Sequence, residues 1–476
     1  MILYVQIKLC NWGQQANLTS RLDYDPGNWR EMTALLEAEL DSGSSDVSPD
    51  QDVDEDDIDE HERIKRRKLG EMASIGEAQS STSFGSPKKN SDAAMEDSCP
   101  HPGFLRDLCI RCGKRSDEGV GVAFGYIHKD LRLGNDEISR LRNADVKSLL
   151  QHKKLYLVLD LDHTVLNSTR LEDVSSEEEY LKCQTDSLQA SSDMIALKLV
   201  DISKGSLFRL DMMRMMTKLR PFVRMFLQEA SNLFEMYIYT MGERAYALEM
   251  AKLLDPSSLY FNSRVISQAD CTQRHQKGLD VVLGLESAVL ILDDTEAVWQ
   301  RHKDNLILME RYHFFSSSCR QFGFSCKSLS ELKSDENESD GALATVLGVL
   351  KRIHSKFFDP EHEGDFATRD VRQVLKSIRR EVLKDCKIVF SRVFPTKFQA
   401  ANHHLWRIAE QLGATCSTEL DSHVTHVVAT DAGTEKSRWA VQEGKFLVHP
   451  RWIEAANYLW QRQPEDKFPV DMPKTK

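Results

Sequence analysis

The chain has 476 residues, 41% of them hydrophobic, which is enough apolar sequence for two or three domains with sizeable cores. The formal net charge of −12 comes mainly from residues 46–62, which hold ten acidic residues and no Lys or Arg. The remainder is nearly balanced, so the net charge implies no general repulsion from nucleic acid, although we expect no direct nucleic-acid partner. The ten Cys are irregularly spaced, and the sequence contains neither a signal peptide nor 18 consecutive apolar residues. These features exclude a disulfide-rich secreted domain and a membrane partner, so we expect a soluble intracellular protein.

Residues 1–98 are rich in Ser, Asp, Glu and Gly and show little apolar periodicity, so we expect a mostly disordered acidic segment. One short helix is indicated at residues 28–40. The basic cluster Lys65–Lys68 fits a nuclear import signal, and it equally fits a solvated charge cluster.

Residues 99–115 contain a compact group of Cys and His. Its members are Cys99, His101, Cys109 and Cys112, with the spacing Cys-x-His-x7-Cys-x2-Cys. Three thiolates and one imidazole can bind structural Zn²⁺ tetrahedrally, and Gly113 after the Cys-x2-Cys pair suits a metal turn. Reduced surface thiols in a flexible segment are the alternative, and the spacing alone leaves both open.

Apolar runs of strand length alternate with helical patterns from residue 146 to 330. We predict strands at residues 155–162, 234–242 and 288–295, and helices at 220–231 and 244–255. This alternation is typical of a parallel α/β sheet with helices on both faces. We therefore expect one α/β domain over residues 146–330.

Polar residues follow all three predicted strands. Asp160 and Asp162 end the first strand, Thr240 the second, and Asp293 with Asp294 the third. The carboxyl ends of parallel strands meet at one edge, where ligands bind. A single acid at such a place is often only a helix cap or turn former. Clustered carboxylates repel one another, however, so three such ends favour a site that holds a hard cation such as Mg²⁺.

The stretch "DLDHT" (residues 160–164) resembles the Asp-x-Asp-x-Thr motif of the haloacid-dehalogenase superfamily. Its flanks, "LVLDLDHTVLNS", resemble the FCP-type phosphatases of the RNA polymerase II C-terminal domain, including the plant C-terminal domain phosphatase-like proteins. The stretches "KLRPFVRMFL", "YIYTMGERAYA", "HQKGL" and "LILDDTEAVW" follow in the family's order over residues 150–325.

This resemblance implies a haloacid-dehalogenase-like fold and a nuclear, Mg²⁺-dependent protein serine phosphatase, with Mn²⁺ or Co²⁺ as substitutes. The implied substrate is the phosphorylated heptad-repeat domain of RNA polymerase II, with general transcription factors as further partners and an aspartyl-phosphate intermediate. The family often carries a Cys/His cluster like that of residues 99–115, which favours zinc there.

The resemblance also implies a role for each polar residue of the predicted sheet edge. Asp160 would be the nucleophile, and Asp162 the general acid and then the general base. Thr164 and Thr240 would orient the loop and contact phosphate, and Lys277 would neutralise charge with the support of Asp293. The Asp160 carboxylate, the Asp162 backbone carbonyl and Asp294 would hold Mg²⁺. Without the resemblance, the two Thr read as turn hydroxyls and Lys277 as a surface residue.

Two positions depart from the family pattern. Gln268 and Thr295 stand where many FCP-type enzymes have Arg. Arg264, Arg274 or Arg301 could supply the missing positive charge. The departures favour an alternative function, a non-catalytic phosphopeptide-binding adaptor in transcription, although the predicted nucleophile, acid and metal ligands are all present.

Two helical patterns, at residues 341–359 and 368–385, predict a helical linker over 341–385. They follow the segment 330–341, which is rich in Ser, Asp and Glu and predicts a flexible surface loop.

Residues 381–473 predict a small α/β domain. Strands are indicated at 386–394 and 424–431, helices at 400–414 and 436–444, and a short strand with a helix at 447–459. This pattern resembles a BRCT domain, which implies that Trp452 is a core residue and that Gly413 permits a tight turn. By the same resemblance, Ser391 and Lys436 are the candidates for phosphate contact.

Overall fold

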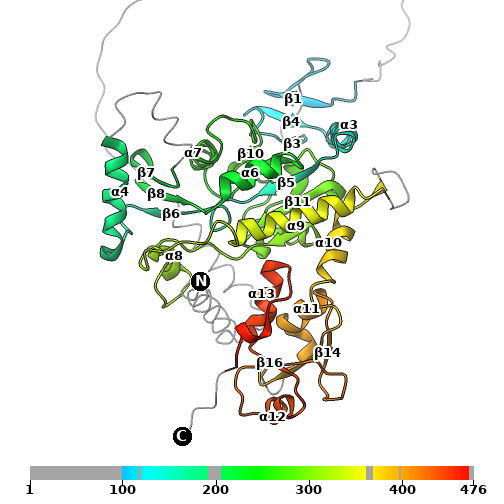
Figure 1. The fold of residues 1–476 in the computed structure, drawn as a ribbon. Coiled ribbons are helices and arrows are strands. Elements are labelled where there is room, and N and C mark those ends of the chain that lie inside the picture. Colours follow the sequence, from blue (N-terminus) through cyan, green and yellow to red (C-terminus); the bar gives the residue numbers. More distant parts are fainter. Residues whose placement is uncertain (1–98, 116–119, 191–204, 361–367, 396–397, 471–476) are drawn as a thin grey trace, which may run out of the picture.

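The computed structural model describes residues 99–115, 120–190, 205–360, 368–395 and 398–470 (Figure 1). The acidic segment, the helix predicted at residues 28–40 and the Lys65–Lys68 cluster lie outside the described residues. Within those ranges, no helix combines the length and the apolar character needed to cross a membrane.

A five-stranded sheet lies at the centre of the molecule, with the strand order β10-β9-β5-β11-β12 and every neighbouring pair parallel. The strands are β5 (Leu155–Leu159), β9 (Phe234–Tyr239), β10 (Val265–Ile266), β11 (Val289–Asp293) and β12 (Leu306–Leu308). All residues of β5 and β11 are buried, as expected for strands covered on both faces. The predicted parallel sheet is confirmed, and its carboxyl ends share one edge.

Helices of this region pack on the sheet, on one another or on neighbouring strands. They are α6 (Val223–Ser231), α7 (Arg244–Leu254), α8 (Ser316–Gln321), α9 (Ala342–Phe357) and α10 (Val371–Arg379). Helix α6 packs on β9 and on α9, α7 packs beside β10, and α9 contacts α10. The helix predicted from residue 220 begins at Val223 because Phe222 adopts a left-handed conformation, with φ 70°.

A second, antiparallel sheet follows the β5 loop directly. It has the order β6-β8-β7, and its strands are β6 (Leu166–Arg170), β7 (Leu207–Leu210) and β8 (Met215–Leu219), with α4 (Glu179–Ala190) after β6. The sequence analysis predicted none of these elements, because "LNSTR" in β6 has no clear apolar alternation. This sheet fixes the chain immediately after Thr164.

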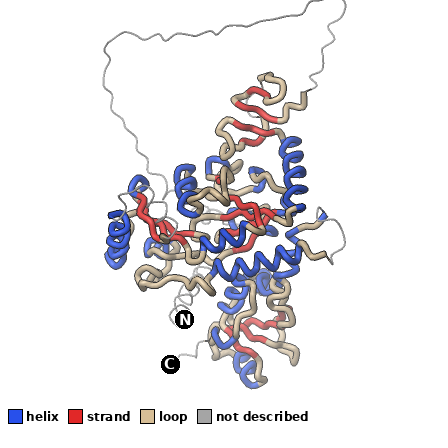
Figure 2. The backbone as a smooth tube through the Cα atoms, turned by 45° about the horizontal axis from the view of Figure 1, so that its top comes forward, coloured by secondary structure: helices blue, strands red, loops and turns tan. Residues whose placement is uncertain are grey.

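The described chain begins with a small antiparallel sheet of order β2-β1-β4-β3, followed by one helix. Its elements are β1 (Gly103–Leu105), β2 (Leu108–Cys109), β3 (Val122–Ala123), β4 (Leu131–Leu133) and α3 (Asn135–Gln151). No element had been predicted between residues 116 and 145. Figures 1 and 2 place this sheet at the opposite end of the molecule from the C-terminal unit.

The C-terminal unit has a four-stranded parallel sheet of order β14-β13-β15-β16. Its elements are β13 (Lys387–Ser391), α11 (His404–Gln411), β14 (Thr415–Ser417), β15 (His426–Ala429), α12 (Glu435–Gln442), β16 (Phe446–Val448) and α13 (Arg451–Leu459). Trp452 is fully buried and its ring stacks on His426 at 4.6 Å. Gly413 has φ +97°, and a Cβ there would lie 1.9 Å from the Arg380 carbonyl oxygen, so the turn requires glycine.

The segment 330–341 is a loop, as predicted, and residues 337–340 are exposed, but the prediction that the loop is flexible is wrong for its first half. Ser330 is fully buried, Asp335 pairs with Lys218 at 2.9 Å, and Glu336 pairs with the buried Arg220 at 2.8 Å. The composition of this segment indicates solvation, but the fold supplies a partner for its acids. The segment is therefore a fixed part of the unit built on the five-stranded sheet.

The C-terminal unit packs on the linker helices. Arg379 of α10 donates a hydrogen bond to the Asn457 side chain of α13 at 2.5 Å, and α13 also contacts α9. One continuous hydrophobic core runs from β5 through α9 and α10 to Trp452. The orientation of the two units is thus set by apolar packing as well as by polar contacts (Figure 2).

Replacing Trp452 by alanine tests the packing of the C-terminal core. We expect Trp452→Ala to lower the free energy of unfolding of this unit by about 3–5 kcal/mol, because it leaves a cavity where a large side chain is fully buried. Urea unfolding followed by circular dichroism measures the change. Val441→Ala, at a side chain 68% exposed, is the control and should change stability by about 0.5 kcal/mol or less. Equal effects would contradict the assignment of Trp452 to the core.

Candidate active site

The loop after β5 carries the first two acids of the site. The Asp160 N–H donates to the Leu292 carbonyl at 3.0 Å, so strand pairing with β11 continues to Asp160. His163 then turns the chain with φ 61°. The buried Arg220 donates to the Thr164 carbonyl at 2.9 Å and so fixes the far side of the loop.

Lys277 joins two of the acids. Its Nζ lies 2.6 Å from Asp160 Oδ1 and 2.6 Å from Asp293 Oδ2. Burial lowers the pKa of Lys277, but the Asp160 and Asp293 carboxylates outweigh it and raise the pKa above its ordinary value. Asp293 also accepts hydrogen bonds from Trp299 Nε1 and from the Thr295 N–H, both at 2.8 Å. Since both its oxygens are engaged, Asp293 supports Lys277, as predicted from the family resemblance.

Asp294 is held in its charged form by a cation. Its Oδ2 accepts from Arg311 Nε at 2.7 Å and from Thr295 Oγ1 at 3.0 Å, and its Oδ1 accepts from Thr164 Oγ1 at 3.3 Å. Burial raises the pKa of Asp294, but Arg311 more than offsets this and the net shift is downward. An ionised carboxylate is the form that can bind a metal.

Asp162 faces a different partner. The Tyr246 hydroxyl donates to Asp162 Oδ1 at 2.5 Å, and Ser168 Oγ lies 2.9 Å from the Tyr246 oxygen. Burial raises the pKa of Asp162, and the Tyr246 hydrogen bond opposes this shift without cancelling it. A raised pKa lets a carboxyl group carry a proton closer to neutral pH, which suits a general acid.

The acids fit a divalent cation. Carboxylate oxygens of Asp160, Asp293 and Asp294 lie within 4.8 Å of one another. Among the residues that the structure describes, Lys277 and Arg311 are the cations paired with these acids, since burial lowers the pKa of the neighbouring His163 and favours its neutral form. The acids outnumber these two cations, and a hard divalent cation with oxygen ligands, such as Mg²⁺, would favour their ionised forms.

The structure brings the predicted site residues to one edge of the sheet. Asp160, Thr164, Lys277, Asp293 and Asp294 are linked by the contacts described above. Thr240 follows the neighbouring strand β9 and accepts a hydrogen bond from the Gly242 N–H at 2.9 Å, which shapes the turn into α7.

Three residues of the site were missed by sequence reasoning. Tyr246 and Trp299 lie inside the stretches "YIYTMGERAYA" and "LILDDTEAVW", but no role had been predicted for either residue. Arg311 lies 17 residues beyond Asp294, in no recognised motif, and only the fold brings the two together.

The cation beside Thr295 is Arg311, whose Nη2 donates to Thr295 Oγ1 at 3.1 Å. Of the three arginines expected to compensate, Arg264 is engaged by the Met236 and Tyr260 carbonyls. Arg274 lines a pocket with Gln268 instead, and Arg301 is exposed. The positive charge next to position 295 therefore belongs to a residue that the sequence did not indicate, and it is paired with Asp294.

The predicted Cys/His ligands come together at the N-terminal sheet. Ligand atoms of Cys99, His101, Cys109 and Cys112 lie within 4.8 Å of one another, with Cys99 Sγ 3.9 Å from Cys109 Sγ and Cys112 Sγ 3.4 Å from His101 Nδ1. Burial raises the pKa of Cys109, but hydrogen bonds, including those from the Cys112 N–H and His101, lower it to about 6. A thiolate is thus accessible near neutral pH, as a zinc ligand requires.

The two candidates of the C-terminal unit lie at one end of β13. Ser391 Oγ is 2.7 Å from Thr434 Oγ1, and Lys436 Nζ donates to the Phe390 and Thr418 carbonyls at 3.4 and 2.8 Å. Thr434, which caps α12 by accepting from the Ser437 N–H, joins them without having been predicted. Ser391, Thr434 and Lys436 lie close together, but each already makes a hydrogen bond within the protein.

Comparison with known proteins places the chain in a family. Residues 155–340 match the NLI interacting factor-like phosphatase family, and residues 379–456 match the BRCA1 C Terminus (BRCT) domain. The chain is 57% identical to RNA polymerase II C-terminal domain phosphatase-like 4 of Arabidopsis thaliana, over 93% of this chain and 94% of that protein. The chain belongs to the RNA polymerase II C-terminal domain phosphatase-like family.

Two further matches support this family and its fold. The chain is 41% identical to C-terminal domain phosphatase-like 3 of the same plant, over 71% of this chain and 28% of that longer protein. The solved structure of Fcp1, described as an essential RNA polymerase II CTD phosphatase, aligns with a TM-score of 0.52 at 25% identity, over 70% of this chain and all of that chain. The expected α/β phosphatase fold with a BRCT domain is confirmed.

Removing Arg220 tests how the nucleophile loop of this family member is held. Arg220 is buried, pairs with Glu336, and donates to the Thr164 and Glu310 carbonyls. We expect Arg220→Met to lower the free energy of unfolding by about 3–5 kcal/mol, because it leaves the buried Glu336 carboxylate without its cation. Urea unfolding gives the value. Arg140→Met, at an exposed pair on α3, should leave the unfolding midpoint unchanged. A stable Arg220→Met protein would show that the loop is held by other contacts.

Proposed function

We propose that the protein is a divalent-metal-dependent protein serine phosphatase that acts in the nucleus on the phosphorylated heptad repeats of RNA polymerase II and so regulates transcription. The α/β catalytic domain, residues 146–330, carries the reaction, and the linker, residues 341–385, joins it to the BRCT domain, residues 381–473. The observation that carries this proposal is the Asp160–Lys277–Asp293 arrangement, in which one lysine holds two acids at the carboxyl edge of the sheet. The family relationship supports the substrate class.

The first chemical step belongs to Asp160. Lys277 binds its Oδ1, which leaves Oδ2 to attack phosphorus in line with the departing serine oxygen. The new bond is an acyl phosphate on Asp160, and the bond that breaks joins phosphorus to the serine oxygen. Lys277 faces the attacked group with a positive charge that offsets the charge spread over the phosphoryl oxygens. Thr164 and Thr240 orient the loops on either side.

Asp162 handles the protons. It gives one proton to the leaving serine oxygen, and in the second step it takes one from the water that attacks the acyl phosphate, so the group returns to its starting state. The Tyr246 hydroxyl fixes one oxygen of Asp162 at 2.5 Å and leaves the other for this transfer. Water attack releases phosphate and restores the Asp160 carboxylate.

The cation, Mg²⁺ or another divalent ion, would be held by Asp160, Asp294 and the Asp162 backbone carbonyl. When bound, it supplies positive charge that stabilises the phosphoryl oxygens. Arg311 and Thr164 keep Asp294 oriented. The alternative of a non-catalytic adaptor is disfavoured because the nucleophile, the acid and the lysine are all assembled in contact with their partners. Phosphate contact by Ser391 and Lys436, like binding of general transcription factors, stays a prediction.

The Cys/His cluster would hold a structural Zn²⁺ far from the catalytic edge. It joins the loop before β1 to the turn after β2, and the small sheet built from these strands buries few apolar residues of its own. A metal would supply the stability that so small a core cannot.

The two aspartates of the nucleophile loop should respond differently to amide substitution. Asp160→Asn should abolish hydrolysis of every phosphate ester, because it removes the atom that bonds phosphorus. Asp162→Asn should slow a phosphoserine peptide by about 10²–10⁴-fold, because an alkoxide leaves poorly unless protonated. An acidic aryl phosphate needs little such help, so Asp162→Asn should release a burst of phenol and then turn over slowly as the acyl phosphate accumulates.

Stopped-flow absorbance measures the burst, and phosphate release from the peptide measures the slow reaction. Asp304→Asn, at an acid whose side chain is 69% exposed, is the matched control and should keep wild-type rates. Retained activity in Asp160→Asn, or equal losses on both substrates in Asp162→Asn without a burst, would overturn these roles.

Elemental analysis tests the zinc site. We expect about one zinc per chain in the purified protein, and its loss in Cys112→Ser, because three ligands hold zinc far more weakly than four. Cys183→Ser, at an exposed free cysteine, should keep the zinc. Residues 99–115 should become protease-sensitive in Cys112→Ser but not in Cys183→Ser. A wild-type protein without zinc would show that the cluster is a set of reduced thiols.

A further inference from the structure

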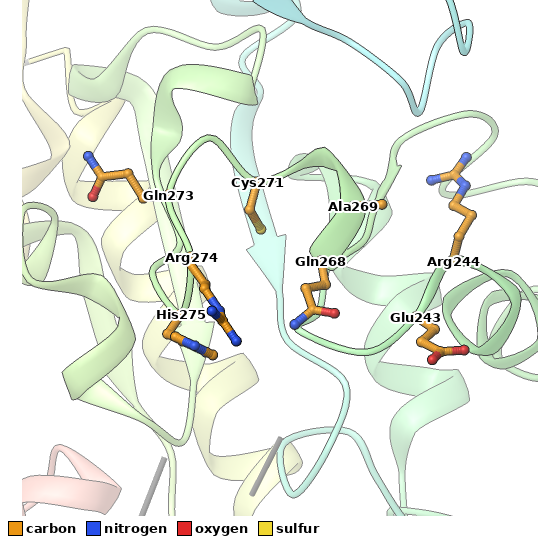
Figure 3. Close-up of a pocket in the computed structure, with 8 residues that line it drawn as sticks. All are labelled: Glu243, Arg244, Gln268, Ala269, Cys271, Gln273, Arg274 and His275. Atoms are coloured by element: carbon orange, nitrogen blue, oxygen red, sulfur yellow. The ribbon is translucent and has the colours of Figure 1, made fainter. Parts of the chain in front are cut away.

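A cavity of about 400 Å³ lies between two turns of the catalytic domain (Figure 3). Glu243 and Arg244, at the start of α7, line one side with Gln268, while Arg274 and His275 line the other. The Gln268 N–H donates to the Gly242 carbonyl at 3.1 Å, which joins Gln268 to the turn before α7. The first side continues the turn that begins with Thr240. The cavity therefore adjoins the proposed phosphate site but does not include the reacting acids.

Arg274 and His275 form the tip of a tight turn. Gln273 and Gln276 pair across it as an isolated antiparallel bridge, and His275 adopts a left-handed conformation with φ 60°. Lys277 comes next, and its N–H is anchored to the Val298 carbonyl at 2.9 Å. A non-glycine residue at positive φ is strained, and such strain persists where the surrounding structure imposes it. The turn thus holds Arg274 at a fixed place three residues from the lysine of the active site.

The charges of the cavity favour an anion. Arg274 is exposed and its guanidinium makes no hydrogen bond or ion pair with any part of the chain that the structure describes. Arg244, by contrast, is engaged by the Val265 carbonyl and by Asp270. His275 Nδ1 is buried without a hydrogen-bond partner.

Figure 3 shows the Gln268, Arg274 and His275 side chains facing a common space, whereas the Glu243 carboxylate points away from them. A free guanidinium, an imidazole and an amide around one space form a donor set suited to a phosphate group.

We propose that this cavity binds a second phosphate on the substrate peptide, two or three residues from the phosphoserine that is hydrolysed. The inference rests on the proposed function. An extended peptide spans about 7–11 Å over two to three residues. The turn that carries Arg274 directly precedes Lys277, so we place the second phosphate at this short separation from the phosphoserine that is hydrolysed. This chain has Gln268 where many FCP-type enzymes have Arg. The Arg274 guanidinium would therefore bind the second phosphate, and the enzyme would prefer multiply phosphorylated repeats.

The test compares heptad peptides that differ only in the second phosphate. One peptide carries a single phosphoserine, others carry two that are two or three residues apart, and another has Glu in place of the second phosphate. For the wild type, kcat/KM should be about tenfold or more higher on the best doubly phosphorylated peptide than on the single one, the usual effect of one charge-assisted contact. The Glu peptide should fall between them, because it offers less charge.

Substitution at Arg274 should remove this preference. In Arg274→Gln, the ratio of kcat/KM on the doubly phosphorylated peptide to kcat/KM on the singly phosphorylated one should fall towards one. In Arg274→Lys, part of this preference should remain, because the charge stays but the bidentate contact is lost. Rates on a small aryl phosphate normalise each variant for active-site integrity. Arg301→Gln, at an exposed arginine outside the cavity lining, is the matched control and should keep the wild-type ratio.

Binding to the Asp160→Asn variant separates the two proposals. Fluorescence anisotropy with the same peptides should show tighter binding of the doubly phosphorylated one, and Arg274→Gln in that background should abolish the difference. If no peptide is hydrolysed but this preference in binding persists, the phosphatase function fails and the subsite stands. A wild-type ratio near one, or an equal loss in Arg301→Gln, would overturn the subsite.

Discussion

The ammonium group of Lys277 is the centre on which the site depends. It lies 2.6 Å from an oxygen of Asp160 and 2.6 Å from one of Asp293, inside a protein region from which water is largely excluded. Two carboxylates that close would repel each other strongly without a cation between them. The lysine therefore fixes the orientation of Asp160, the proposed nucleophile, and holds together the ends of the neighbouring strands β5 and β11.

The remaining parts of the site are arranged to keep this charge balance. Arg311 neutralises Asp294, and its guanidinium lies over the Phe322 ring at 4.1 Å. Arg220 donates hydrogen bonds to the Thr164 and Glu310 backbone carbonyls, and the Glu336 carboxylate balances its charge. Each buried cation thus has an acid partner, and the acids in excess are those that the proposed divalent ion would meet.

The two flanking units contribute in different ways. The N-terminal sheet with its Cys/His cluster lies at the end of the molecule away from the BRCT domain (Figure 1), so a metal there would stabilise structure without touching the reaction. The BRCT domain shares a continuous hydrophobic core with α9 and α10. Its position relative to the catalytic edge is therefore fixed, which suits a protein that must present a long peptide substrate in one register. The cavity at Arg274 extends that register beyond the reacting serine.

Local patterns in the sequence determined the elements whose signal is contiguous. The buried run of β5, the periodicity of α7, and the glycine at position 413 are read correctly because each depends on neighbouring residues. The acids at strand ends followed from the same logic, since parallel strands must bring their carboxyl ends together. The motif resemblance then supplied the roles of Asp160, Asp162 and Lys277.

The tertiary structure decided what depends on residues far apart in the chain. The short strands β6 and β14 are strands because they pair with β8 and β13, which lie far from them in the sequence. The acidic segment at 330–341 is fixed because Arg220 is buried beside it, although its composition alone indicates a solvated loop. Arg311 reaches Asp294 only after β12 returns the chain to the same edge. Sequence patterns report the local preferences of a segment, whereas the partner of a buried charge is set by folding, because only folding removes water and makes the pairing necessary.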